Sequence, residues 1–231
     1  MLNIKACTWT VVGLLSLAAA GTAHAVTLAD LIASGTPVTS GDKIFSNFSY
    51  VSPGNLMPAN RIAVTFVPNE GLQFSAGWNT AYGQSEMESL IGYTVTVQPG
   101  AGKTIAGVGL SFAGVVAEAG GVAFVGEQLR DTQGNVVANL SVISDDEGPI
   151  VDRFQDSATI SPPLSSLVVL KDISVTPVKD NPASFASVTF VDNTFVQIPS
   201  IGPTPPIPEP MSLALLPLGL LGLSLRRKFA R

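Results

Sequence analysis

Cysteine and histidine each occur only once in the 231 residues, and both lie near the N-terminus, as Cys7 and His24. If the first 25 residues are removed on export, the remaining chain has neither residue. A Cys/His metal site, a cysteine nucleophile and a Ser-His-Asp triad are then excluded within this chain. Disulfide bonds are excluded as well, although export leads to a compartment that permits them.

Charged residues are also scarce, at 13% of the chain, whereas a quarter is usual. The balance is acidic, with 17 Asp and Glu against 12 Lys and Arg, and between residues 26 and 207 it becomes 16 against 7, a net charge of −9. Nucleic-acid binding needs a basic surface, so nucleic acid is not expected as a partner. The 22 glycines and 17 prolines are typical of a β-rich protein with many turns.

The first 25 residues have the three parts of a secretory signal peptide. Lys5 supplies the positive charge, the segment 11–20 (VVGLLSLAAA) is apolar, and Ala23-His24-Ala25 is a small-x-small cleavage site. The apolar run is shorter than the roughly 20 residues that span a bilayer. We therefore predict cleavage by signal peptidase after Ala25 and a mature chain that begins at Val26.

The C-terminal end also has an ordered series of segments. A Pro-rich linker over residues 198–207 (IPSIGPTPPI) is followed by Pro208-Glu209-Pro210 and then by the apolar segment 211–225 (MSLALLPLGLLGLSL). As a helix, this apolar segment would be about 22 Å long, short of the roughly 30 Å hydrocarbon core. Arg226, Arg227 and Lys228 follow it and would keep the end of the chain in the cytoplasm. A marginal membrane helix of this kind suits a temporary anchor that is later removed.

Residues 208–228 (PEPMSLALLPLGLLGLSLRRK) closely resemble the PEP-CTERM sorting signal of Gram-negative bacteria. The resemblance covers about a tenth of the chain and implies processing by an exosortase at Pro208, Glu209 and Pro210. It also implies a precursor tethered briefly to the inner membrane and a mature protein at the cell surface or in the extracellular matrix. Such proteins often accompany exopolysaccharide and biofilm production. The alternative is a plain single-span anchor that is never cut.

The body, residues 26–197, has the periodicity of β-strands. Tyr93 to Val97 alternates strictly, and turn signals such as Pro99-Gly100 and Gly134-Asn135 separate the runs. About ten strands at this spacing predict an all-β fold, an antiparallel β-sandwich. Only residues 28–34 (LADLIAS) look helical, with Gly35 ending the turn. Further predicted strands are 61–67, 104–113, 122–129, 136–142, 166–176 and 184–198.

The body is also similar to other PEP-CTERM ectodomains, for which no activity is established. The similarity lies in Gly41-Asp42-Lys43 with the aromatics Phe45, Phe48 and Tyr50 after it, and in a late Lys171-Asp172-Ile173. The favoured interpretation of the three aromatics is core packing.

The densest acidic cluster consists of Asp145, Asp146, Glu147, Asp152 and Asp156. Ca²⁺ takes six to eight oxygen ligands, so a weak extracellular Ca²⁺ site is one hypothesis for this cluster. The spacing fits no EF-hand loop, and the favoured interpretation is a solvated loop beside an edge strand.

Trp78 and Tyr82 lie in a polar, glycine-rich stretch and could stack on sugar rings if both are exposed. The favoured interpretation of Trp78 is a buried core residue. Glu86 and Glu88 nearby could form the carboxylate pair of a glycosidase, but nothing else in the sequence supports this.

Three functions follow from these observations. The first, which we adopt, is an exported non-catalytic surface or matrix protein sorted by an exosortase. The second is a carbohydrate-binding module that holds exopolysaccharide, and the third is a secreted hydrolase that works with carboxylates alone. No cofactor is expected apart from the hypothetical Ca²⁺.

Overall fold

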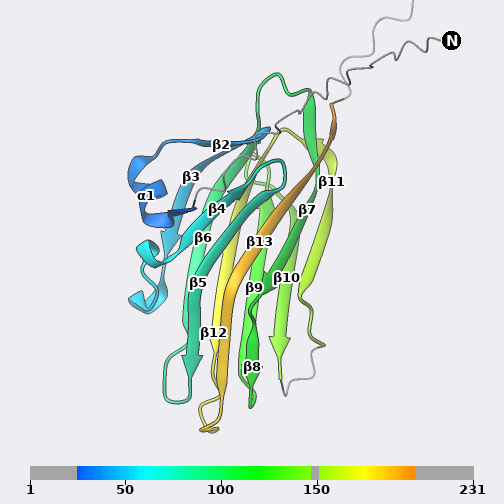
Figure 1. Cartoon of the computed structure of the whole chain (residues 1–231). Coiled ribbons are helices and arrows are strands. Elements are labelled where there is room, and N and C mark those ends of the chain that lie inside the picture. Colours follow the sequence, from blue (N-terminus) through cyan, green and yellow to red (C-terminus); the bar gives the residue numbers. More distant parts are fainter. Residues whose placement is uncertain (1–24, 147–150, 201–231) are drawn as a thin grey trace, which may run out of the picture. The chain divides into compact units, whose positions relative to one another are not determined.

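The computed structural model describes residues 25–146 and 151–200, and its strands form two antiparallel sheets (Figure 1). The sheets share one hydrophobic core, so the predicted all-β architecture is confirmed. Most of the expected signal peptide and linker, and all of the expected sorting segment, lie outside the described residues. Within the described ranges, no helix is both long and apolar enough to cross a membrane.

The first sheet has seven strands and contains the longest strand of the described chain, β13. Its order is β1 (Ala25–Thr27), β4 (Ala63–Val67), β5 (Gly71–Ala81), β13 (Phe185–Pro199), β7 (Lys103–Ala113) and β11 (Gln155–Leu164), with β8 (Val116–Glu118) also paired to β13. The last strand before the linker therefore lies inside this sheet and not at its edge.

The second sheet has six strands, with β12 and β6 at its centre. Its order is β10 (Val136–Asp145), β9 (Val122–Arg130), β12 (Ser166–Thr176), β6 (Met87–Val97), β3 (Lys43–Val51) and β2 (Val38–Ser40). Ten of the thirteen described strands are longer than three residues, which accounts for the predicted number. Seven of these ten overlap a strand range named from the sequence. The longer strands β3, β5 and β11 and the three short strands β1, β2 and β8 were not named.

Alternation along the strands explains which side chains enter the core. In β12, every second residue from Leu167 to Val175 is buried, Lys171 included, whereas the residues between them are more exposed. Aromatic rings join the two sheets: Phe45 of β3 lies 5.3 Å from Phe66 of β4 between ring centroids. Phe45 is fully buried, and Phe48 and Tyr50 are partly buried against the core, so the core-packing interpretation of these aromatics is confirmed.

The single α-helix of the described residues, α1 (Leu28–Ser34), begins and ends where the sequence predicts. Thr27 caps its start by accepting a hydrogen bond from the backbone N–H of Asp30 at 3.1 Å. Gly35 ends it in the left-handed conformation, with φ of 58°, and donates its N–H to Leu31 O. Leu28 and Leu31 are buried and attach the helix to the core. Two 3₁₀ turns, η1 (Pro53–Asn55) and η2 (Ala59–Arg61), lie between β3 and β4.

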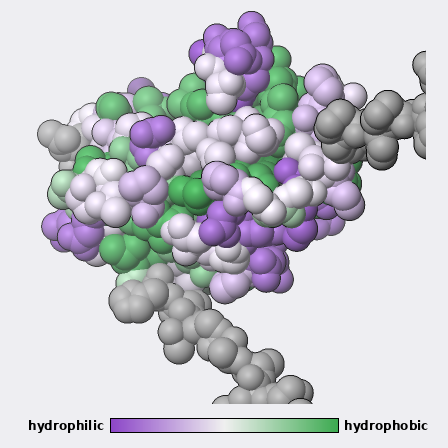
Figure 2. Space-filling model, turned by 90° about the horizontal axis from the view of Figure 1, so that it is seen from above, coloured by the Kyte–Doolittle hydropathy of each residue, from purple (hydrophilic) through white to green (hydrophobic). Residues whose placement is uncertain are grey.

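The surface mixes hydrophobic and hydrophilic residues at short range, as the view from above shows (Figure 2). Exposed large hydrophobic side chains occur on several strands, among them Val51, Leu90 and Leu170 of the six-stranded sheet. These three gather on one outer face.

Candidate functional site

Trp78 does not lie on the surface, so its predicted role in sugar stacking is wrong. Its side chain is 0% exposed within the core, and its indole N–H donates to Ser89 Oγ at 3.0 Å. Trp78 lies on β5, where alternation places it with the buried Phe74 and Thr80. The interpretation as a core residue is confirmed. Tyr82, just beyond β5, is 47% exposed and has no stacking partner in Trp78.

Three carboxylates of the predicted acidic cluster each accept a hydrogen bond from a different backbone N–H. Asp152 Oδ1 accepts from the backbone N–H of Asp145 at 2.9 Å, and Asp146 Oδ2 accepts from Ala119 N–H at 2.8 Å. Asp156 Oδ2 accepts from the N–H of Ser141 at 2.9 Å. Residues 25–146 and 151–200 contain no group of three or more potential metal ligands. Glu147 lies outside the described residues, and the Ca²⁺ site remains a prediction.

A groove of about 520 Å³ crosses the outer face of the six-stranded sheet. Strand register places its outward-facing side chains in two adjacent rows that run across β3, β6, β12, β9 and β10. The first row is Ser49, Gly92, Leu170, Gln128 and Asn139, and the second is Val51, Leu90, Asp172, Gly126 and Ser141. All of these except Ser141 line the groove.

Two glycines give the groove its depth. A Cβ at Gly92 would lie 2.5 Å from Ser49 Oγ, and one at Gly126 would lie 3.1 Å from the ring of Phe124. Larger residues at these two positions would therefore fill the space between the rows. Leu90 and Leu170, both more than a third exposed, form apolar walls beside them. Gln128 and Asn139 add amide groups at the far end of the first row, joined by a hydrogen bond of 3.3 Å.

Asp172 is the charged residue of the two outward-facing rows and is held in an unfavourable environment. Its Oδ1 atom is buried and has no hydrogen-bond partner among the described residues. Burial raises the pKa of this carboxyl, and the negative charges of Glu88 and Glu86 raise it further. Glu86 itself accepts a hydrogen bond from Ser174 Oγ at 2.7 Å. The charges of the hypothetical pair Glu86 and Glu88 therefore act on a third carboxyl, Asp172. The sequence marked Asp172 only through the resemblance of Lys171-Asp172-Ile173, and not as a site residue.

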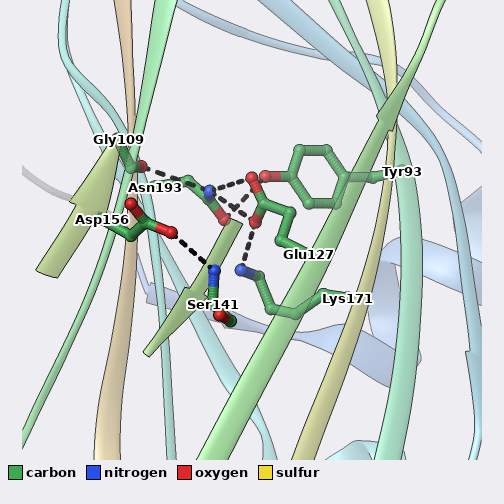
Figure 3. A network of polar contacts seen from close by, with 7 residues as sticks. All are labelled: Tyr93, Gly109, Glu127, Ser141, Asp156, Lys171 and Asn193. Carbon is green, nitrogen blue, oxygen red and sulfur yellow. Dashed lines mark hydrogen bonds and ion pairs between the residues drawn. The ribbon is translucent and has the colours of Figure 1, made fainter. Parts of the chain in front are cut away.

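A buried polar network lies in the core (Figure 3), and two of its residues, Glu127 and Lys171, also line this groove. The ion pair between Lys171 Nζ and Glu127 Oε2 is 2.5 Å long, and both side chains are fully buried. Asn193, from the opposite sheet, donates its side-chain N–H groups to Glu127 Oε1 at 2.9 Å and Oε2 at 2.7 Å. Tyr93 OH donates to Asn193 Oδ1 at 3.0 Å. The network thus connects the two sheets through their centres.

Burial shifts the pKa values of Lys171 and Tyr93 in the directions expected for groups removed from water. Desolvation lowers the pKa of Lys171, and the nearby Glu127 opposes that shift only in part. Desolvation raises the pKa of Tyr93 well above its ordinary value, and the charge of Glu127 adds to the effect. Tyr93 therefore keeps its proton and acts as a hydrogen-bond donor.

A second buried lysine, Lys43, holds the end of the sandwich where β13 leaves it. Its Nζ donates to Asp42 Oδ1 at 2.9 Å, to Asn69 O at 2.8 Å and to Gln197 Oε1 at 3.2 Å. Lys103, on the surface, binds the other oxygen of Asp42 at 2.7 Å. The lysines of Gly41-Asp42-Lys43 and Lys171-Asp172-Ile173, which the sequence had marked by resemblance alone, are thus both core residues.

No protein-family model and no curated protein matches this sequence. Among solved structures, TmCBM61 in complex with beta-1,4-galactotriose is 10% identical with a TM-score of 0.29, over 71% of this chain and 94% of that one. The xylan-binding module CBM15 is 12% identical with a TM-score of 0.24, over 70% and 95%. Xylanase10C from Cellvibrio japonicus is 12% identical with a TM-score of 0.24, over 70% and 28%. At these scores the likenesses carry no argument about function.

Proposed function

We propose that this chain is an exported, non-catalytic protein of the cell surface or extracellular matrix, processed by an exosortase at Pro208-Glu209-Pro210. The order of linker, PEP motif, apolar segment and basic end over residues 198–231 carries the proposal. The fold is compatible with removal of this end, because the last buried hydrophobic residue of the described chain is Phe195. Cleavage at residue 208 takes nothing from that core.

The proposed route of export and processing follows from the segments at the two ends of the sequence. Signal peptidase cuts after Ala25, and the segment 211–225 holds the precursor in the inner membrane, with Arg226, Arg227 and Lys228 on the cytoplasmic side. The exosortase then releases the sandwich to the surface or the matrix. In this scheme β1 keeps Val26 and Thr27, which pair with Val64 and Ala63 of β4.

Changing Pro208, Glu209 and Pro210 together to alanine is expected to stop maturation. The full chain, expressed in its producer, should then accumulate in the membrane fraction at the precursor mass, whereas the natural sequence yields a shorter product. Changing Pro203, Pro205 and Pro206 to alanine is the matched control, because it removes three linker prolines and leaves the motif intact. Normal maturation of the first variant would refute exosortase sorting at this motif.

The groove of the six-stranded sheet supports a second function, carbohydrate binding. Its apolar walls suit the C–H faces of sugar rings, and its amides and carboxylate suit their hydroxyl groups. Asp172, Glu88 and Glu86 make its surroundings negative, which favours a neutral or amino-bearing polysaccharide over a polyanion. The site proposed for sugar therefore differs from the Trp78 and Tyr82 site predicted from sequence.

Asp172→Asn is expected to weaken binding to the producer's exopolysaccharide while raising the stability of the protein. Asparagine removes a desolvated charge and its repulsion by Glu88, so the free energy of unfolding at neutral pH should rise by about 0.5–1 kcal/mol. The stability gain should disappear at low pH. Because the folded-state pKa of Asp172 is raised, the cost of its charge begins as the pH rises through the unfolded-state pKa and is complete only above the folded-state pKa. Co-sedimentation and urea titration measure the two effects, with Asp192→Asn on the other sheet as control. Unchanged binding would remove the groove as a sugar site.

A further inference from the structure

The buried network brings together an amine, a carboxylate and a carboxamide in an arrangement suited to a reaction between them. Lys171 Nζ and Asn193 Nδ2 both donate to the same oxygen, Glu127 Oε2, the first at 2.5 Å and the second at 2.7 Å. The two nitrogens are therefore separated by no more than the sum of these distances. The three residues come from three different strands, β12, β9 and β13, and Lys171, Glu127 and Asn193 are each 3% exposed or less.

We propose that Lys171 and Asn193 join in an intramolecular isopeptide bond, formed by the folded chain itself, with Glu127 transferring the protons. Glu127 first takes a proton from Lys171 Nζ, and the lone pair of the neutral amine attacks Cγ of Asn193. The Nζ–Cγ bond forms, the Cγ–Nδ2 bond breaks, and its electron pair leaves on nitrogen. Glu127 returns this proton to the Asn193 nitrogen, which departs as ammonia. The carboxylate then takes the second proton from Nζ, so the new amide keeps a single N–H and Glu127 is left protonated. Nothing is oxidised or reduced, and no co-reactant is needed.

Each position in the network fits one step of this reaction. Burial favours the neutral form of Lys171, which is the nucleophilic form. The side-chain N–H groups of Asn193 already contact both oxygens of Glu127, so the carboxyl group can protonate the leaving nitrogen. Tyr93 OH, which keeps its proton, donates to Asn193 Oδ1, where negative charge develops during attack. The fold holds all four groups together, so the reaction has no cost of bringing them into contact.

The other buried lysine, Lys43, lacks the groups that this reaction needs. Lys43 Nζ contacts a carboxylate, a backbone carbonyl and the side-chain oxygen of Gln197. Gln197 Nε2, however, has no hydrogen-bond partner within the described residues, so no carboxylate is in place to protonate it as a leaving group. Asp42 is also shared with Lys103, which keeps this cluster ionic.

The bond would give the mature chain a covalent link that it cannot obtain from cysteine. It would join β12 of one sheet to β13 of the other, six residues before β13 ends at Pro199. The strand that leads to the linker would then be fixed to the opposite sheet through its side chain. Such a link restricts the unfolded chain in the same way as a disulfide.

Mass spectrometry of the purified, denatured full chain tests the proposal directly. A tryptic digest should contain one branched species, in which residues 154–179 are uncut at Lys171 and are joined to the peptide that begins at Asp180. Its mass should be lower than the sum of its parts by one ammonia. Unlinked peptides ending at Lys171 and containing an intact Asn193 would overturn the proposal. Ammonia loss that fragmentation assigns to a succinimide at another asparagine would overturn it as well.

Variants separate the reaction from simple packing. Glu127→Gln keeps the size of the side chain but removes the proton carrier, and Lys171→Arg keeps the positive charge but removes the nucleophile. Both are expected to be soluble and to show no branched peptide. Lys103→Arg, the matched change at a surface lysine, should retain it in full. A branched peptide of unchanged abundance in Glu127→Gln would refute the role of Glu127. Loss of the branched peptide in Lys103→Arg would contradict its assignment to Lys171.

Discussion

Replacing Trp78 by alanine is expected to lower the free energy of unfolding by about 3–5 kcal/mol, the range measured for large aromatic residues removed from protein cores. Trp78 is the largest of the fully buried side chains, and its removal would leave a cavity between the sheets. The loss extends to hydrogen bonds. Ser89 Oγ accepts from the indole N–H at 3.0 Å and contacts Tyr50 OH at 2.9 Å, and Tyr50 OH donates to Met57 O at 2.5 Å.

Urea titration of the full chain measures this effect, and two further variants identify its cause. Trp78→Phe keeps much of the ring but loses the N–H, so it should cost clearly less than alanine. Tyr82→Ala, four residues later and 47% exposed, should change the unfolding free energy by no more than about 0.5 kcal/mol. If Trp78→Ala were as stable as Tyr82→Ala, the assignment of Trp78 to the core would be refuted, and a surface role would have to be considered again.

The favoured core interpretation of Trp78 was correct, and the failed alternative, sugar stacking, shows what local composition leaves out. Gly77, Asn79 and Thr80 make the stretch look polar, but β5 places alternate residues on opposite faces, and Trp78 lies on the inward one. The same alternation does identify the residues of the buried network. Lys171 follows Leu167 and Val169 at even spacing, and Glu127 follows Ala123 and Val125. Each could therefore have been assigned to the core from its strand.

Contacts between strands far apart in the sequence could not have been predicted in this way. Glu127 and Asn193 are 66 residues apart and belong to different sheets, so their hydrogen bond depends on how the sheets pack. The groove likewise depends on register: Gly92 pairs with Leu170, and Gly126 pairs with Asp172. Alternation within one strand carries no information about which strand lies beside it.

Signals within a few residues were sufficient to predict elements that depend on short-range contacts. Thr27 and Gly35 bound the helix α1 because a cap acts within one turn. Strand β11 was not predicted, since Pro162 and Pro163 interrupt its pattern, and it lies at the edge of its sheet, where proline is tolerated. The short strands β1, β2 and β8 have three residues each, too few for a period to be recognised.

Gly71→Ala is expected to destabilise the protein by about 3 kcal/mol, a large effect for the addition of one methyl group. Gly71 begins β5 and lies against β13, where a Cβ would come within 1.8 Å of the backbone oxygen of Asn193. A backbone atom cannot rotate away as a side chain can, so β13 would have to move. That movement would also displace the Asn193 side chain from Glu127 and Tyr93.

Gly77→Ala is the matched control for this prediction, because it adds the same methyl group to the same strand. At Gly77 the nearest atom to a Cβ is Asn79 Nδ2, at 3.5 Å, which is an ordinary contact with a side chain that can move. Its unfolding free energy should therefore stay within about 0.5 kcal/mol of that of the natural sequence. Equal stabilities of the two variants in urea would contradict the close approach of β5 and β13. A loss confined to Gly71→Ala would show that Asn193 is held in place by a backbone contact that only glycine permits.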